Sequence, residues 1–158
     1  MRLSKNFMLA EFEKSQTAIR LGYNNEVPPQ HLPSLRSLVD NVLQPVRDEF
    51  GPVQISSGYR SKFLNAAIGG STRSQHCSGQ AADFEVPGVS NYDLATWIRD
   101  NLTFDQLILE GHRKYVIGSG WVHCSFTDFG PNRKDVLTAT FVNGKATYTR
   151  GLSNGYAT

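Results

Sequence analysis

The chain has few cysteines, almost no net charge and no long apolar run. Two cysteines in 158 residues are too few for the disulfide framework of small secreted domains. Sixteen basic against fourteen acidic side chains leave a net charge of +2. So small an excess does not indicate a nucleic-acid-binding surface, and we expect no nucleic-acid partner.

No apolar segment approaches the roughly 18 residues that a membrane-spanning helix needs, so we expect no membrane span. Glu11 and Glu13 stand where a secretory signal would carry its apolar core, and we therefore expect no signal peptide. The length and the 39% apolar content are typical of one globular domain, 1–158, acting as a monomer. Within it we expect a helical part over about 1–50, a sheet core over 53–149 and a flexible tail over 150–158.

Helical periodicity is clearest in the first third of the chain. Apolar residues at three- and four-residue spacing from Leu35 to Val46 predict a helix, which Pro45 should kink or break. A short helix is expected over 6–15. Ser61 and Ser90 are suitable N-caps for two further helices.

Strand candidates gather in the second half of the chain. Asn143-Gly144 between β-branched runs is a strong hairpin signal, because both turn positions need positive φ. The candidate strands are 53–56, 81–86, 105–110, 121–126, 136–142 and 146–149. Helices followed by hairpin-linked strands predict an α+β fold with a mainly antiparallel sheet flanked by helices.

Three residues in two segments form a candidate metal site. His76 lies in a polar loop, and Asp83 lies in the strand that follows, where a turn at Gly79 would let the two side chains converge. His123 lies in a second strand. Two histidines and one aspartate make a suitable three-ligand set for one Zn²⁺ ion, with a fourth position open for water. The alternative is that these histidines are structural.

A hydrolytic zinc site also needs a general base, and Glu110 is the candidate. If 105–110 and 121–126 form a hairpin with Glu110 opposite Trp121, then Ile108 lies opposite His123. Glu110 would then share the face of His123, roughly 7–8 Å away, because side chains alternate along a strand. A slip of one residue would turn Glu110 away and leave it an exposed charge.

Arg60 lies between a strand and a helix, where its guanidinium could hold a substrate carboxylate or stabilise an oxyanion. The alternative is a surface salt bridge.

The cysteines each follow a histidine. Adjacent strand residues point to opposite faces, so Cys124 should pack in an apolar layer if His123 faces the metal. A disulfide between Cys77 and Cys124 remains an alternative to two free thiols.

Several ordered motifs resemble the zinc D-Ala-D-Ala-peptidase family over about residues 7–126. They are Ser57-Gly58-Tyr59-Arg60-Ser61, then Ser74-x-His76-x-x-Gly79-x-Ala81-x-Asp83, then Trp121-x-His123. The family includes D-Ala-D-Ala carboxypeptidases and dipeptidases and phage endolysins that cut L-alanyl-D-glutamate bonds. It shares a wider group with lysostaphin-type peptidases and the Hedgehog signalling domain, so the resemblance implies a Hedgehog-like fold.

The resemblance implies roles for individual residues. His76, Asp83 and His123 match the metal ligands, and Arg60 matches the arginine that binds substrate or polarises the scissile carbonyl. Ser74 matches a residue that often touches substrate.

Many members carry the base two or three residues before the last ligand, where this chain has Trp121 and Gly120. In the branch that this chain most resembles, a glutamate ends the preceding strand instead, which matches Glu110. His112, in the following loop, is the second candidate for acid–base or substrate-binding work.

The implied function is zinc-dependent hydrolysis of peptidoglycan stem peptides, as by a phage endolysin released to the host periplasm and cell wall. A bacterial relative in the cytoplasm or periplasm is the alternative origin. The amide that is cut, L-Ala–D-Glu or a bond to D-Ala, stays open. The competing readings are a non-catalytic zinc-containing binding module on the same scaffold and a virion structural protein.

Overall fold

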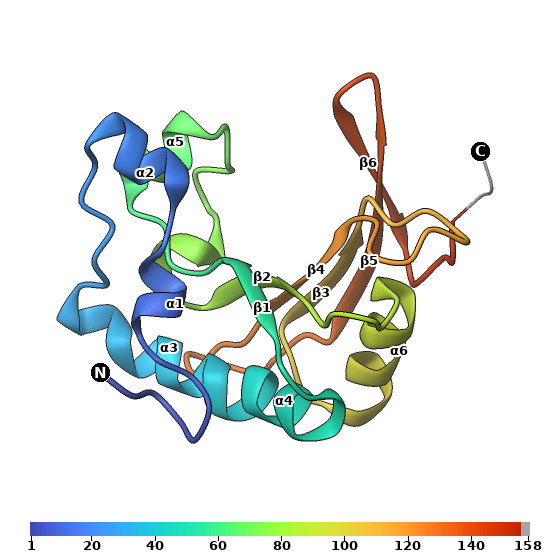
Figure 1. Cartoon of the computed structure of the whole chain (residues 1–158), viewed down its shortest axis with the longest axis horizontal. Coiled ribbons are helices and arrows are strands. Elements are labelled where there is room, and N and C mark those ends of the chain that lie inside the picture. Colours follow the sequence, from blue (N-terminus) through green and yellow to red (C-terminus); the bar gives the residue numbers. More distant parts are fainter. Residues whose placement is uncertain (156–158) are drawn as a thin grey trace.

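The computed structural model describes residues 1–155 and is built around one six-stranded sheet with the strand order β1-β2-β4-β3-β5-β6. Helices α3, α4 and α6 pack under the sheet, and α1, α2 and α5 gather on the side of β1 (Figure 1). The strands are β1 (Gln54–Ser57), β2 (Ala81–Glu85), β3 (Gln106–Glu110), β4 (Trp121–Ser125), β5 (Asp135–Val142) and β6 (Lys145–Arg150). The predicted α+β class is confirmed.

The helices are short except under the sheet. They are α1 (Ala10–Glu13), α2 (Gln16–Leu21), α3 (Leu32–Leu38), α4 (Gln44–Phe50), α5 (Lys62–Ala67) and α6 (Asn91–Asn101), with the 3₁₀ turns η1 (Pro29–His31) and η3 (Gln75–Ser78). None of the helices in residues 1–155 has the length and apolar character that crossing a bilayer requires. The Ser61 and Ser90 hydroxyls cap α5 and α6 as predicted.

Two helix predictions need correction. The helix expected over 6–15 is confined to α1, since residues 1–9 instead form a turn held by a bridge between Arg2 and Met8. The second helix was expected to kink or break at Pro45, and it does not break there. It continues from α3 to α4 through a single π-helical stretch, η2 (Val39–Leu43). Pro45 then lies in the first turn of α4, where a missing N–H is tolerated.

The sheet is mixed rather than built from hairpins throughout. Four of its pairings are antiparallel, but β5 runs parallel to β3. The reason is that both edges of β4 are already occupied by β2 and β3, so the chain must return to the free edge of β3. Backbone bonds from Lys134 to Phe104 and from Asp135 to Asp105 begin that parallel pairing. The predicted hairpin at Asn143-Gly144 then joins β5 to β6.

The two faces of the sheet have opposite character because side chains alternate along each strand. One face, carrying Phe84, Leu107, Leu109, Val122 and Cys124, is fully buried against α3, α4 and α6. Cys124 therefore packs in the apolar layer as predicted. Both cysteines are free thiols, so the alternative of a disulfide is excluded. The other face carries the polar side chains that are described below.

Gly58 lets the N-terminal segment pack directly against the end of β1. A Cβ atom at Gly58 would lie 2.6 Å from the Phe12 Cα and 2.7 Å from its carbonyl oxygen. That carbonyl accepts a hydrogen bond from the Tyr59 N–H at 2.8 Å. The ring of Phe12 is completely buried in the core, so the backbone of α1 has little freedom to move away.

We expect Gly58→Ala to lower the free energy of unfolding by about 1–3 kcal/mol, because overpacking forces the backbone apart. Urea unfolding followed by circular dichroism measures the change. The control is Gln54→Ala, an exposed position of β1, which should stay within about 0.5 kcal/mol of the parent. An unchanged stability for Gly58→Ala would contradict the close approach.

Asp105 ties together η3, the start of β3 and the loop before β5. Its carboxylate accepts hydrogen bonds from the Arg133 backbone N–H and guanidinium at 2.9–3.1 Å and from Gln75 Nε2 at 3.0 Å. Burial alone would raise the pKa of Asp105, but the bonds from Arg133 outweigh it and lower the pKa. The carboxylate thus stabilises the fold in its charged form.

We expect Asp105→Asn to cost about 1–3 kcal/mol of unfolding free energy at neutral pH. The folded pKa lies below the unfolded value of about 3.9, so the contribution is complete above about pH 5 and is lost as pH falls through the folded pKa. Urea unfolding across that range should show the gap between parent and variant narrowing below about pH 4. The exposed Asp40→Asn serves as the control and should show no such gap.

Candidate metal centre

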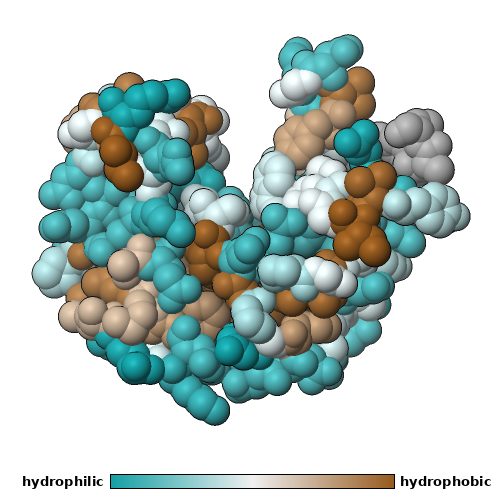
Figure 2. Space-filling view, viewed as in Figure 1, coloured by the Kyte–Doolittle hydropathy of each residue, from teal (hydrophilic) through white to brown (hydrophobic). Residues whose placement is uncertain are grey.

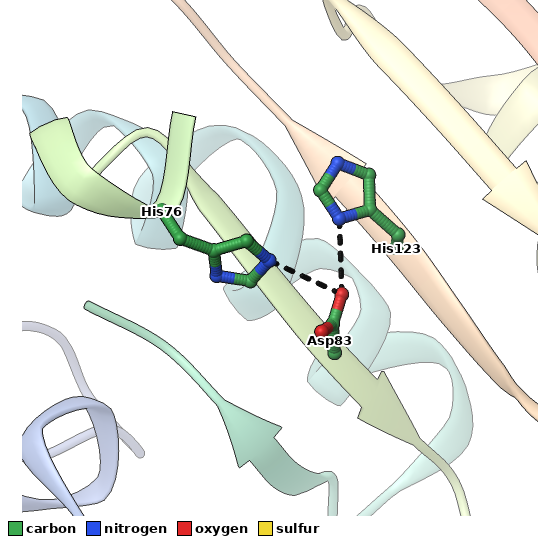
Figure 3. A group of neighbouring side chains, drawn as sticks. All are labelled: His76, Asp83 and His123. Carbon is green, nitrogen blue, oxygen red and sulfur yellow. Dashed lines mark hydrogen bonds and ion pairs between the residues drawn. The ribbon is translucent and has the colours of Figure 1, made fainter. Parts of the chain in front are cut away.

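The side chains of His76, Asp83 and His123 converge at the polar face of the sheet (Figure 3). Asp83 in β2 lies directly opposite His123 in β4, and His76 reaches the pair from η3. The Asp83 Oδ1 atom lies 2.9 Å from His123 Nδ1 and 3.3 Å from His76 Nε2. One ligand atom from each residue lies within 4.8 Å of the others.

The local sequence sets the direction of His76. Ser74 caps η3 by accepting a hydrogen bond from the His76 backbone N–H, and Gly79 ends the turn in a left-handed conformation with φ 73°. This conformation favours glycine and turns the chain into β2. His76 Nδ1 lies 2.7 Å from the Gly58 carbonyl oxygen, which can only accept a hydrogen bond, so Nδ1 carries a proton and Nε2 is the nitrogen that faces Asp83.

Asp83 is a buried carboxylate that is held from two sides. Its Oδ2 atom accepts a hydrogen bond from Arg60 Nη2 at 3.2 Å, while Oδ1 faces the two histidines. Burial opposes the charge, but His76 and the hydrogen bond from His123 dominate and hold the pKa of Asp83 well below its usual range. Burial lowers the pKa of His76 in spite of the Asp83 charge. A charged carboxylate and a neutral imidazole are the forms that bind a metal ion.

This donor set fits a zinc ion. Neutral imidazole nitrogens and a carboxylate oxygen are ordinary zinc ligands, and three protein ligands are usual where a fourth position takes water or substrate. The hydrogen bonds made by the candidate ligands also fit a zinc site. In such sites the ring nitrogen of a histidine that does not bind the metal commonly donates to a backbone carbonyl, and a ligating carboxylate commonly accepts a hydrogen bond. The Gly58 carbonyl and the Arg60 guanidinium provide these two contacts.

Arg60 is held by three contacts within the protein. Besides Asp83, its guanidinium donates to the Ser57 hydroxyl at 3.0 Å and to Asn65 Oδ1 at 3.3 Å. Asn65 is fixed in turn by donating to the Ser71 carbonyl at 2.8 Å. The guanidinium therefore has a defined position at the edge of the metal centre, with 14% of the side chain exposed.

Glu110 lies at the end of β3 in the expected register, opposite Trp121, with Ile108 opposite His123. The Trp121 indole N–H donates to Glu110 Oε2 at 2.8 Å. Burial, with a smaller contribution from the charge of Asp83, raises the pKa of Glu110. A carboxylate with a raised pKa beside a candidate metal centre is suited to accepting and returning a proton.

Position 120 has no room for an acidic side chain. Gly120 has φ +69°, and a Cβ atom there would overlap the carbonyl oxygen of Glu110. The backbone of β3 thus occupies the space that a side chain would need. The acidic side chain comes from the neighbouring strand instead, and Trp121 serves to orient it.

A cavity of about 520 Å³ contains these groups and opens between two raised parts of the molecule (Figure 2). That volume is in the range of small-ligand sites. The cavity brings together the predicted residues Arg60, Ser74, His76, Asp83, Glu110 and His123. It is also lined by residues that were not predicted as site residues, among them Arg73, Gln75, Gln106, Trp121, Arg133 and Tyr148.

His112 is not part of this cavity. It lines a separate hollow beside α6, where its ring stacks on Tyr92 at a centroid distance of 6.2 Å. Its Nε2 atom lies 3.0 Å from Asn154 Oδ1, and its Nδ1 atom is buried without a hydrogen-bond partner in residues 1–155. A role for His112 in substrate binding stays a prediction that this arrangement does not support.

Sequence reasoning missed four contributors to the site. The Gly58 carbonyl lies within the Ser57–Ser61 motif and Asn65 lies four residues after it, so the motif itself was the available signal. Trp121 was identifiable as the neighbour of Glu110 once the register was assumed. Tyr148 had no signal, because its place depends on the parallel pairing of β5 with β3.

Comparison with known proteins gives one family. Residues 5–125 match the family model described as Peptidase M15, while no curated protein matches the chain. The match covers most of the 158 residues and includes all three converging side chains and Glu110. The resemblance seen in the motifs is thereby confirmed, and the chain belongs to the peptidase M15 family, the zinc D-Ala-D-Ala peptidases.

Proposed function

We propose that this protein is a zinc-dependent peptidase that hydrolyses amide bonds in peptidoglycan stem peptides, acting as a phage endolysin. The observation that carries the proposal is the convergence of His76, Asp83 and His123 in one cavity with Glu110. Family membership supports a peptidase. The arginines that line the cavity, Arg60, Arg73 and Arg133, favour an anionic substrate such as a stem peptide with free carboxylates.

His76, Asp83 and His123 would hold the zinc ion. When bound, zinc polarises the scissile carbonyl and lowers the pKa of a water molecule to about 7. Glu110 accepts the proton of the attacking water at its carboxylate and returns it to the nitrogen of the leaving amine. The Trp121 N–H holds one Glu110 oxygen, which leaves the other free for this transfer.

Arg60 and Ser74 are proposed to contact the substrate. The Arg60 guanidinium is held at the cavity wall by Ser57 and Asn65, so it presents a fixed positive charge to a carboxylate or a developing oxyanion. The Ser74 hydroxyl already accepts from the His76 N–H and can still donate its proton to a peptide oxygen.

Zinc binding is tested directly on the purified protein. We expect the protein to bind about one Zn²⁺ per chain after equilibration in a zinc buffer. Asp83→Asn should weaken zinc binding by more than about 10–100-fold, the loss typical when a residue that only hydrogen-bonds to a ligand is replaced. Isothermal titration calorimetry measures both. Asp93→Asn removes an exposed carboxylate on α6 and should bind as the parent does. Equal zinc affinity in the Asp83 variant would refute the assigned ligands.

The catalytic role of Glu110 is tested with Glu110→Gln. We expect the rate of peptidoglycan hydrolysis to fall by about 10²–10⁴-fold with zinc affinity retained, because the amide cannot take a proton. Release of free amines from purified peptidoglycan measures the rate. The matched control, Glu49→Gln on the exposed side of α4, should keep full activity. Full activity in the Glu110 variant would show that another group is the base.

Mass spectrometry of the released fragments identifies the bond, either L-Ala–D-Glu or a bond to D-Ala. A wild-type protein that binds zinc but releases no amines from any peptidoglycan would favour the second candidate, a non-catalytic zinc module. In that case the carboxylate of Glu110 would have no proton to transfer.

A further inference from the structure

The β5–β6 hairpin lies beyond the part of the chain that matches the family model, which ends at residue 125. The hairpin stands up from the end of the sheet (Figure 1) and forms one of the two raised parts beside the cleft in Figure 2. One of its side chains, Tyr148 of β6, lines the same cavity as the candidate metal centre. The hairpin therefore adds a wall to the site.

Strand register places Tyr148 in line with the proposed base. Trp121, Glu110, Ala139 and Tyr148 are successive partners across β4, β3, β5 and β6, so their side chains share one face. Two strand spacings of about 4.8 Å separate the backbones of Glu110 and Tyr148. The residue between them, Ala139, is small and buried, so the two longer side chains stand on either side of it above the sheet.

A second aromatic contact fixes the hairpin against the site. The rings of Phe141 in β5 and Trp121 in β4 stack with centroids 5.9 Å apart and an interplanar angle of 30°. The same Trp121 donates its indole N–H to Glu110. Phe141 therefore connects the hairpin to the side chain that orients the base, and Tyr148 is held at a defined distance from the centre of the cavity.

The Tyr148 hydroxyl is available to a ligand. The residue is 53% exposed, and its hydroxyl makes no hydrogen bond within residues 1–155. A tyrosine hydroxyl, with an ordinary pKa of about 10, keeps its proton at neutral pH. Burial and the negative charge of Glu110 raise the pKa of Tyr148 further. A half-exposed phenol with an unused O–H donor is suited to binding an oxygen acceptor beside an apolar ring.

We propose that Tyr148 contacts the substrate of this peptidase, donating a hydrogen bond to a carbonyl or carboxylate oxygen of the peptide on the Glu110 side of the cleft. Arg60 lies across the metal centre from it, on the β1 side of Asp83. An extended peptide lying across the strands can therefore contact Arg60 at one end and Tyr148 at the other. This inference rests on the proposed peptidase function and adds a specificity-determining residue to it.

The hydroxyl is tested with Tyr148→Phe. We expect KM for a soluble stem peptide to rise by about 3–10-fold with kcat little changed, because a lost hydrogen bond is worth about 0.5–1.5 kcal/mol and acts on substrate binding. Thermal unfolding should be unchanged, since the ring is retained. The matched control is Tyr115→Phe, a tyrosine that is 81% exposed in the loop between β3 and β4.

A binding measurement separates this inference from the proposed function. Calorimetry of the stem peptide with Glu110→Gln, in which turnover is strongly slowed, should show the same 3–10-fold rise in Kd when Tyr148→Phe is added. Unchanged KM and Kd in the Tyr148→Phe variants would overturn the role of the hydroxyl, as would an equal loss in the Tyr115 control. Failure of the wild type to cleave peptidoglycan would count against the peptidase proposal instead, and the binding measurement would still decide the role of Tyr148.

Discussion

The antiparallel pairing of β2 with β4 places Asp83 directly opposite His123, and the candidate metal centre is arranged around this pair. Register matters here because the side-chain period of a strand is two, so a slip of one residue would turn either ligand into the apolar core. The fully buried residues beside them, Phe84 and Val122, make such a slip costly. The same packing that stabilises the sheet therefore fixes the positions of two of the three candidate ligands.

A buried carboxylate is expensive in the absence of partners, and Asp83 shows how the cost is offset. Arg60 donates to one of its oxygens, and the two histidines lie against the other. Removing any one partner would leave charge or hydrogen-bonding capacity uncompensated, so the centre behaves as one connected unit. The orientation of His76 depends on Gly58, whose carbonyl oxygen accepts a hydrogen bond from the His76 ring. Because Gly58 has no side chain, the backbone of Phe12 can pack directly against it.

The parallel pairing of β5 with β3 places the β5–β6 hairpin on the side of the cavity away from β1. Because β4 has no free edge, the chain returns beside β3 and carries the hairpin to the end of the sheet where Glu110 lies. The stacked rings of Trp121 and Phe141 then connect the hairpin to Glu110, to which the Trp121 indole donates. Arg60, beside Asp83, and Tyr148 in β6 line the two sides of one cavity, over which the proposed peptide substrate would lie.

The amino-acid sequence by itself determined the strand positions, the serine caps, the Asn143-Gly144 turn and the three candidate ligands. These depend on local alternation, on side chains that cap their own helix, and on ordered motifs. The register that brings Glu110 opposite Trp121 was also accessible, because two strands joined by a loop tend to pair. Tertiary structure alone decided the parallel place of β5, the engagement of Arg60 with Asp83, the distance of His112 from the cavity and the presence of Tyr148 within it. Each of these depends on contacts between residues far apart in the chain, and such contacts leave no local pattern in its sequence.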